Sequence, residues 1–209
     1  MGLSAEQLKG SLDSLAGIEP AIASALERCG YPEPRISTPG YVTLLRAIVG
    51  QQVSIKAAAA IWDRVDSVTG GADDPAKVAT ASLEDLRGAG LSWSKAAYAH
   101  SLAEEVMTGR LDLHALPQDD EEAIAALTHV KGIGRWSAEV YLLFAEGRPD
   151  IWPAGDLAVQ IEVGRILGLD GKPTEKQTRA LAEPWRPHRG AAAIFAWYHR
   201  RQSNILGRD

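Results

Sequence analysis

The chain has 209 residues, enough for one compact unit or for two lobes that each bury a core. Its formal net charge is −5, so any DNA-binding surface must be local, because phosphate affinity is mostly cationic. The single cysteine, Cys29, excludes a disulfide framework, a Cys-rich zinc site and a four-cysteine iron–sulfur cluster. No apolar stretch is long enough to cross a bilayer, and the first residues are no signal peptide. We therefore expect a soluble intracellular protein, in the cytoplasm or nucleoid if bacterial.

Apolar residues recur with helical spacing along the first half of the chain. Short amphipathic runs cover residues 5–15 and 18–29. Residues 41–65 form a longer helical region, but the Gly50-Gln51-Gln52-Val53-Ser54 segment interrupts it and predicts two helices. Residues 70–75 predict a loop, and a capping box at residues 82–85 predicts the start of a short helix.

The second half continues the helical pattern without a convincing alternating strand. Residues 94–107 predict a helix, and a second capping box at residues 119–122 opens the next. Beyond a glycine turn, Val140, Leu143 and Phe144 form an apolar stripe on a further helix. Two more helices are expected from about Asp156 and over residues 189–201. The chain as a whole predicts an all-α fold.

The glycine turn Lys131-Gly132-Ile133-Gly134 has two interpretations. It can be a plain connection between helices, in which glycine supplies positive φ at no steric cost. It can also offer main-chain N–H groups to a DNA phosphate, as helix N-termini do. The basic residues Lys131 and Arg135 and the nearby Ser137 favour phosphate contact. A dinucleotide-binding loop is excluded, because a helix rather than a strand precedes it.

Asp156 follows the Trp152-Pro153-Ala154-Gly155 segment at the start of a predicted helix. An aspartate at this position is most often an N-cap. The cap is compatible with catalysis, because a helix N-terminus favours the ionised carboxylate. An anion is what a reaction with a developing cationic sugar requires.

These residues resemble a known family. The segment LTHVKGIGRWSAEVYLLF, followed by DIWPAGDLAVQ, is similar to the helix-hairpin-helix DNA glycosylases, and specifically to the 3-methyladenine DNA glycosylase II branch. The resemblance continues in residues 48–62, 86–106 and 182–201, and so covers the chain from about Tyr41 onward. It implies two helical lobes flanking an active-site cleft, in the compact form without an N-terminal β domain. The expected lobes are residues 39–147, with the hairpin at 119–145, and residues 1–38 with 148–209.

The resemblance assigns roles to individual positions of the reaction site. Asp156 falls on the catalytic aspartate, and Gln52 falls where relatives push a side chain into the gap left by the flipped nucleotide. Trp197 matches an aromatic wall of the base pocket. Trp136 stands where bifunctional glycosylase/lyases hold a Schiff-base lysine, so hydrolysis without strand nicking is implied. Trp136 and Trp152 either line the base pocket or support it.

The hairpin residues also match the family. DNA-backbone contacts are expected from Lys131, Gly132, Gly134, Arg135 and Ser137. The main-chain carbonyls of Thr128, Val130 and Ile133 match positions that hold a structural Na⁺ or K⁺ ion, and no cofactor is expected for catalysis. Of the other tryptophans, Trp62, Trp93 and Trp185 are expected in the core.

Two positions depart from the family pattern. Gly155 replaces the first of two adjacent acids at the catalytic turn, and Val140 replaces an aromatic that lines the pocket in some relatives. The implied activity is release of 3-methyladenine, 7-methylguanine and similar bases from double-stranded DNA by a monomeric enzyme. Two alternatives stay open: a non-catalytic DNA-binding module and a bifunctional glycosylase/lyase. The range of bases is not fixed by the sequence.

Overall fold

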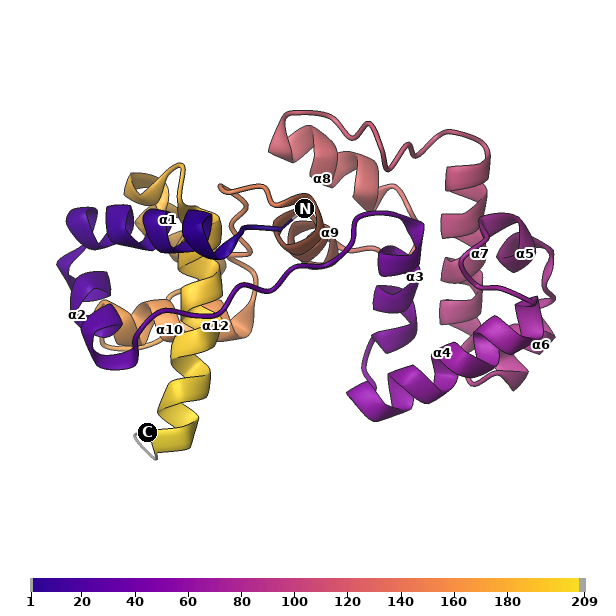
Figure 1. Ribbon diagram of the computed structural model, residues 1–209, viewed down its shortest axis with the longest axis horizontal. Helices are drawn as coiled ribbons and strands as arrows, with labels where there is room; N and C mark the ends of the chain where they lie inside the picture. Colours follow the sequence, from indigo (N-terminus) through magenta and orange to yellow (C-terminus); the bar gives the residue numbers. More distant parts are fainter. Residues whose placement is uncertain (1, 207–209) are drawn as a thin grey trace. The chain divides into compact units, whose positions relative to one another are not determined.

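The computed structural model describes residues 2–206, with side chains up to residue 203. Within this range the chain is helical and contains no strand, which confirms the all-α prediction (Figure 1). No helix among these residues is long and apolar enough to cross a membrane. The elements are α1 (Ala5–Ile18), α2 (Pro20–Cys29), α3 (Tyr41–Gly50), α4 (Ile55–Thr69), α5 (Pro75–Thr80), α6 (Leu83–Gly88), α7 (Trp93–Met107), α8 (Asp120–Thr128), α9 (Arg135–Tyr141), the π-helix η1 (Leu142–Glu146), α10 (Leu157–Ile166), α11 (Glu175–Leu181), the 3₁₀ helix η2 (Glu183–Trp185) and α12 (Arg189–Leu206).

The chain divides into two compact units. Unit 1 comprises residues 1–37 and 142–209, and unit 2 comprises residues 38–141. The first boundary lies within a residue of the expected one. The second lies at the change from α9 to η1, six residues earlier than the expected end of the lobe at residue 147.

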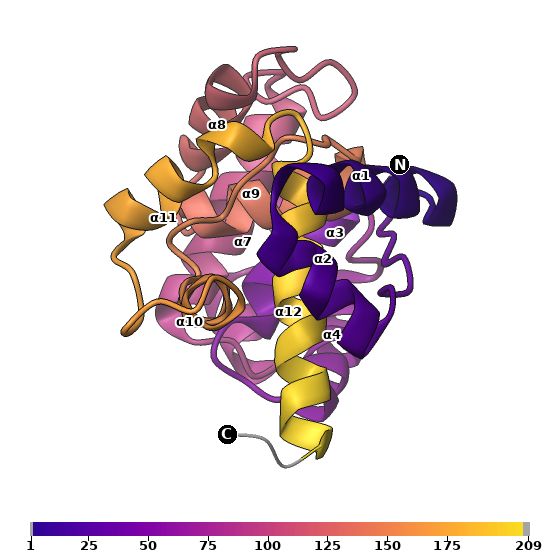
Figure 2. The same ribbon diagram turned by 90° about the vertical axis from the view of Figure 1, so that its left-hand side faces the viewer.

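Unit 1 is built around α12. Figure 2 shows this helix running beside α10, with α1 and α2 against it. Its apolar core includes Leu8, Leu12 and Leu15 of α1 and Phe195 of α12. A buried hydrogen bond also joins α10 to α12, because the Glu162 carboxylate is fully buried and lies 2.7 Å from Nδ1 of His199.

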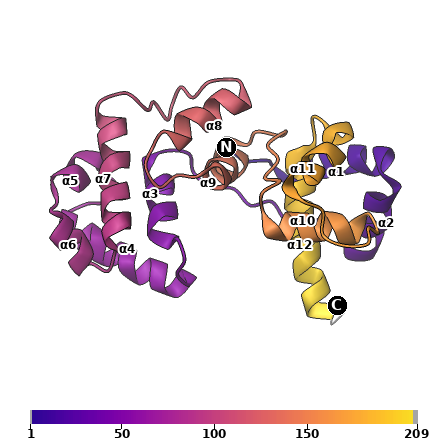
Figure 3. The ribbon, with the colours of Figure 1, turned by 180° about the vertical axis from the view of Figure 1, so that it is seen from behind.

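Unit 2 is built around α7, which packs against α3, α5 and α6 (Figure 3). The α3 residues Leu44, Leu45 and Ile48 and the α7 residue Leu102 are buried in its core. The predicted break between α3 and α4 is present, and Ser54 caps α4 by accepting the N–H of Ala57.

Short helices differ most from the sequence predictions. The expected loop at residues 70–75 ends in α5, whose first residue Pro75 follows the N-cap Asp74. Helix α11 begins with a capping box at Thr174 and Gln177 and was not predicted. Trp93 was expected in the core but is 50% exposed, because it is the first residue of α7 and stacks under Arg87 at the surface.

Candidate active site

A tight turn in unit 1 holds Asp156. The Asp156 N–H donates to the Pro153 carbonyl at 2.9 Å, and Gln160 Nε2 donates to the Ala154 carbonyl at 2.8 Å. Gln160 is buried on α10, so its hydrogen bond connects the turn to the helix that follows. Asp156 is the N-cap of α10, as predicted, and its backbone is extended. The local sequence therefore fixes the position of the acid before any ligand binds.

The Asp156 carboxylate is oriented from two helices. Its Oδ1 accepts the Val159 N–H of α10 at 2.9 Å and the Trp197 Nε1–H of α12 at 3.1 Å. Trp197 is half-buried, and its ring centroid lies 5.6 Å from that of Phe144. Trp197 was predicted only as a pocket wall, so its hydrogen bond to the acid is an additional contact.

Trp152 and Trp136, both predicted for the base pocket, lie in different surroundings. Trp152 is buried in unit 1, where its Nε1–H donates to the Thr178 carbonyl and its ring meets Trp185 edge to face. These contacts fit a supporting role better than a pocket wall. Trp136 lies in the first turn of α9 in unit 2 and is 50% exposed. Its ring therefore has the accessibility that contact with a ligand requires.

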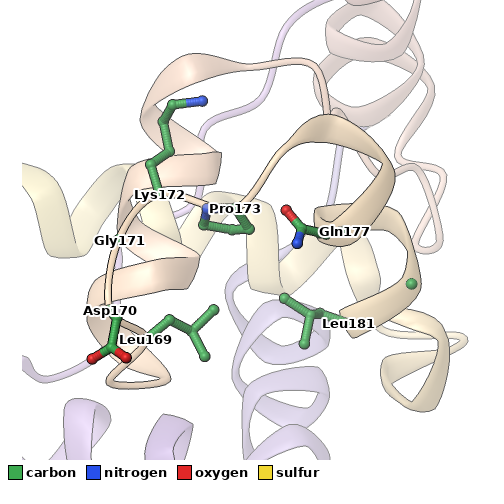
Figure 4. Close-up of a pocket in the computed structure, with 8 residues that line it drawn as sticks. Leu169, Asp170, Gly171, Lys172, Pro173, Gln177 and Leu181 are labelled. Carbon is green, nitrogen blue, oxygen red and sulfur yellow. The ribbon is translucent and has the colours of Figure 1, made fainter.

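A hollow of about 620 Å³ on unit 1 lies between the loop after α10 and α11 (Figure 4). Leu169, Pro173 and Leu181 give it an apolar lining. None of the predicted site residues lines it, so it is not the predicted base pocket. At the turn before Asp156, a side chain at Gly155 would lie 3.4 Å from a Glu175 carboxylate oxygen. A second acid at position 155 would thus face like charge.

The predicted hairpin joins α8 to α9 in unit 2. Gly132 has φ of +87°, a conformation that favours glycine, whereas Gly134 does not. A side chain on Gly132 would overlap the Tyr98 ring, but one on Gly134 would meet open space. Lys131 is exposed and Ser137 is half-buried. The backbone of the turn is therefore accessible at Gly134, whereas at Gly132 it packs against Tyr98.

Arg135 is tied to acidic side chains of the hairpin. Its guanidinium forms two hydrogen bonds to Glu121 on α8, at 2.8 and 2.5 Å, and one to the buried Glu139 on α9 at 2.9 Å. Hydrogen bonding to Glu121 is the largest cause of the raised pKa of Arg135. A phosphate would have to compete with these ion pairs. The structure thus gives Arg135 the role of joining α8 to α9, in addition to the phosphate contact predicted for it.

The three carbonyls predicted to hold an alkali-metal ion end or follow α8. Thr128 is the last residue of α8, and helix ends leave carbonyls without helical partners. The Val130 carbonyl accepts the Ile133 N–H at 3.1 Å, which uses one of its two lone pairs. Such main-chain oxygens suit a hard cation, so the donor set fits the predicted ion.

Gln52 is exposed and has φ of +56°. It is the only non-glycine residue with positive φ in the described part of the chain, and such strain is concentrated at functional sites. The neighbouring Gln51 is half-buried, and its Nε2 donates to the Gly132 carbonyl at 2.9 Å. No sequence signal marks this bond, because 81 residues separate its partners.

The contrast between the two hairpin glycines leads to a stability prediction. We expect Gly132→Ala to lower the free energy of unfolding by about 2 kcal/mol, because the new methyl group meets Tyr98 and the backbone stays at positive φ. Thermal unfolding should show Tm lower by roughly 6 °C. Gly134→Ala is the matched control and should change Tm little. Equal losses in the two variants would contradict this account.

Comparison with known proteins places these features in a family. The family described as "HhH-GPD superfamily base excision DNA repair protein" matches residues 45–187. DNA-3-methyladenine glycosylase 1 of Schizosaccharomyces pombe is 34% identical over 161 residues, which cover 75% of this chain and 71% of the relative. DNA-3-methyladenine glycosylase 2 of Escherichia coli is 30% identical over 191 residues, which cover 85% of this chain and 65% of the relative.

A solved structure also matches nearly the whole chain. It is the Schizosaccharomyces pombe 3-methyladenine DNA glycosylase in complex with abasic DNA, with a TM-score of 0.79 and 30% identity. The match covers 96% of this chain and 99% of that one. The chain is shorter than some curated relatives, since it spans 58% of one from Bacillus subtilis and 65% of the Escherichia coli protein.

Proposed function

The chain belongs to the HhH-GPD superfamily of base excision DNA repair proteins, and from this premise we propose that it is a monofunctional DNA glycosylase for alkylated bases. The observation that carries the proposal is the carboxylate of Asp156, held in a fixed orientation by Val159 and Trp197. The named relatives are DNA-3-methyladenine glycosylases, which supports the substrate class.

The reaction breaks the N-glycosidic bond of a nucleotide rotated out of the duplex. Extrusion costs a few kcal/mol, and less for a damaged base that pairs poorly, which gives some selection before chemistry begins. N3- and N7-alkylated purines carry positive charge and are neutralised as they leave. Little general acid catalysis is therefore needed. These cationic bases also stack well on tryptophan, a role that we assign to Trp136 and Trp197.

Asp156 supplies the electrostatic part of the mechanism. As the base departs, positive charge develops on the sugar, and the fixed anion stabilises it without reorganising. The same carboxylate helps a water molecule to attack the anomeric carbon. Position 136 holds tryptophan rather than lysine, so no amine is present there to form a covalent imine with the sugar. The products are a free base and an intact abasic strand.

DNA is held by elements of unit 2 in this proposal. The hairpin N–H groups and Lys131 contact a phosphate, and Gln52 enters the gap left by the extruded nucleotide. The carbonyls of Thr128, Val130 and Ile133 are the proposed ligands of a structural Na⁺ or K⁺ ion, which would add positive charge beside that phosphate. We assign double-stranded DNA with alkylated bases as the partner of a monomer that acts inside the cell.

Base release from methylated duplex DNA tests the function. Purified protein should liberate 3-methyladenine or 7-methylguanine, identified by chromatography of the soluble fraction. The remaining strand should break only after alkali treatment, because hydrolysis leaves an abasic site. Borohydride should trap no protein–DNA adduct. A trapped adduct would instead establish the bifunctional glycosylase/lyase, and DNA binding without base release would establish the non-catalytic module.

A further inference from the structure

Helix α7 contacts both DNA-binding loops of unit 2 through one side. Lys95, Tyr98 and Ser101 are spaced three residues apart, so they project from neighbouring turns of the helix. Lys95 bonds to the loop after α3, the Tyr98 ring lies against Gly132, and Ser101 Oγ accepts the Lys131 N–H at 3.3 Å. One helix thus supports two loops that are far apart in the sequence.

Lys95 holds the backbone of the wedge loop, which we define as residues 51–54. Its Nζ donates to the carbonyls of Val49 and Gln51, at 2.9 and 2.5 Å. These carbonyls lie at the C-terminus of α3, where the helix supplies no N–H group to bond to them. Burial lowers the pKa of Lys95, which agrees with an ammonium group drawn partly out of water. The cation therefore braces the chain immediately before the strained residue Gln52.

Gln51 connects the wedge loop to the hairpin. Its side-chain amide donates to the Gly132 carbonyl, and the Tyr98 ring occupies the place that a side chain on Gly132 would take. A strained residue such as Gln52 persists only where its surroundings fix it, and the contacts of Lys95 and Gln51 fix the chain immediately before it.

We propose that Lys95 and Gln51 are positioning residues that hold the wedge loop and the hairpin as one rigid platform on α7. Insertion of Gln52 into the duplex and contact of the hairpin with a phosphate then occur at a fixed spacing. The inference rests on the proposed glycosylase function, because it assigns neither residue a contact with the reacting base. It predicts that both residues matter for duplex DNA and little for a lesion that is already unstacked.

The test compares Lys95→Met and Gln51→Ala with Lys77→Met. Lys77 is the matched control, since its Nζ also donates to a carbonyl at a helix C-terminus, that of Gly70, at 2.7 Å. Single-turnover release of 7-methylguanine should fall about ten- to a hundredfold on duplex DNA for Lys95→Met, the scale of a lost charged hydrogen bond. Release from single-stranded DNA should stay near wild type. Lys95→Arg should restore most of the duplex rate.

A second readout does not require base release. A 2-aminopurine placed beside an abasic-site analogue in a duplex should fluoresce more when Gln52 unstacks it. Lys95→Met and Gln51→Ala should weaken this signal, and Lys77→Met should not. Equal rate losses on duplex and single-stranded DNA, or a wild-type signal in both variants, would overturn the platform. If wild-type protein released no base, the glycosylase proposal would fail. The 2-aminopurine signal would still test whether Lys95 and Gln51 hold the wedge loop and the hairpin as one platform.

Discussion

Asp156→Asn should lower the single-turnover rate of base release by about 10²- to 10³-fold, the cost of removing one preorganised electrostatic group from a transition state. Asparagine is neutral, so it cannot stabilise the positive charge that develops on the sugar. The rate is measured with enzyme in excess over a duplex that carries one 7-methylguanine. DNA binding should change little, because the substitution acts on the transition state rather than on the hairpin contacts.

The same substitution separates catalysis from helix capping. Asparagine caps helices about as well as aspartate, and its Oδ1 can still accept from Val159 and Trp197. Stability should therefore be nearly unchanged. Asp74→Asn is the matched control, since Asp74 caps α5 by accepting the Ala76 N–H at 2.9 Å, and it should retain the full rate. Full release by Asp156→Asn would leave Asp156 as a cap alone.

Much of the helical framework was predictable because its signals are local. Apolar spacing identified the long helices, and the Gly50–Ser54 interruption separated α3 from α4. The N-cap position of Asp156 was also predicted, since it depends on a few neighbouring residues, whereas the turn did not indicate which of its two glycines has positive φ. Helix α5 was not predicted, because Asp74-Pro75 is also typical of a loop, although proline is favoured at the first helical position.

The contacts that orient the site were not predictable, because they join distant segments. The Trp197 bond to Asp156 requires α12 to pack against α10, and nothing near Trp197 in the sequence indicates this. The bonds from Gln51 to Gly132 and from Lys95 to the α3 terminus likewise depend on tertiary packing. The basic character of Arg135 predicted a phosphate contact, but its ion pairs with Glu121 and Glu139 could not be predicted from it.

Trp197→Phe should reduce the rate of base release about ten- to a hundredfold, because it removes a hydrogen bond to a charged group worth about 1.5–3 kcal/mol. Phenylalanine keeps an aromatic face toward Phe144, so apolar contact with a base is largely retained. The loss should appear in the rate at saturating enzyme and not in the enzyme concentration that gives half the maximal rate. If Trp197 acted only as a wall of the base pocket, the substitution would instead raise the enzyme concentration that gives half the maximal rate and leave the rate at saturating enzyme unchanged.

A double-mutant cycle identifies the group through which Trp197 acts. If the indole N–H orients the Asp156 carboxylate, Trp197→Phe should cost much less in an Asp156→Asn background than in the wild type. Additive losses would mean that Trp197 contributes independently, through the base or through packing. Because Glu162 and His199 join α10 to α12 separately, Trp197→Phe should leave the two helices in contact. The rate loss then reports the orientation of the acid.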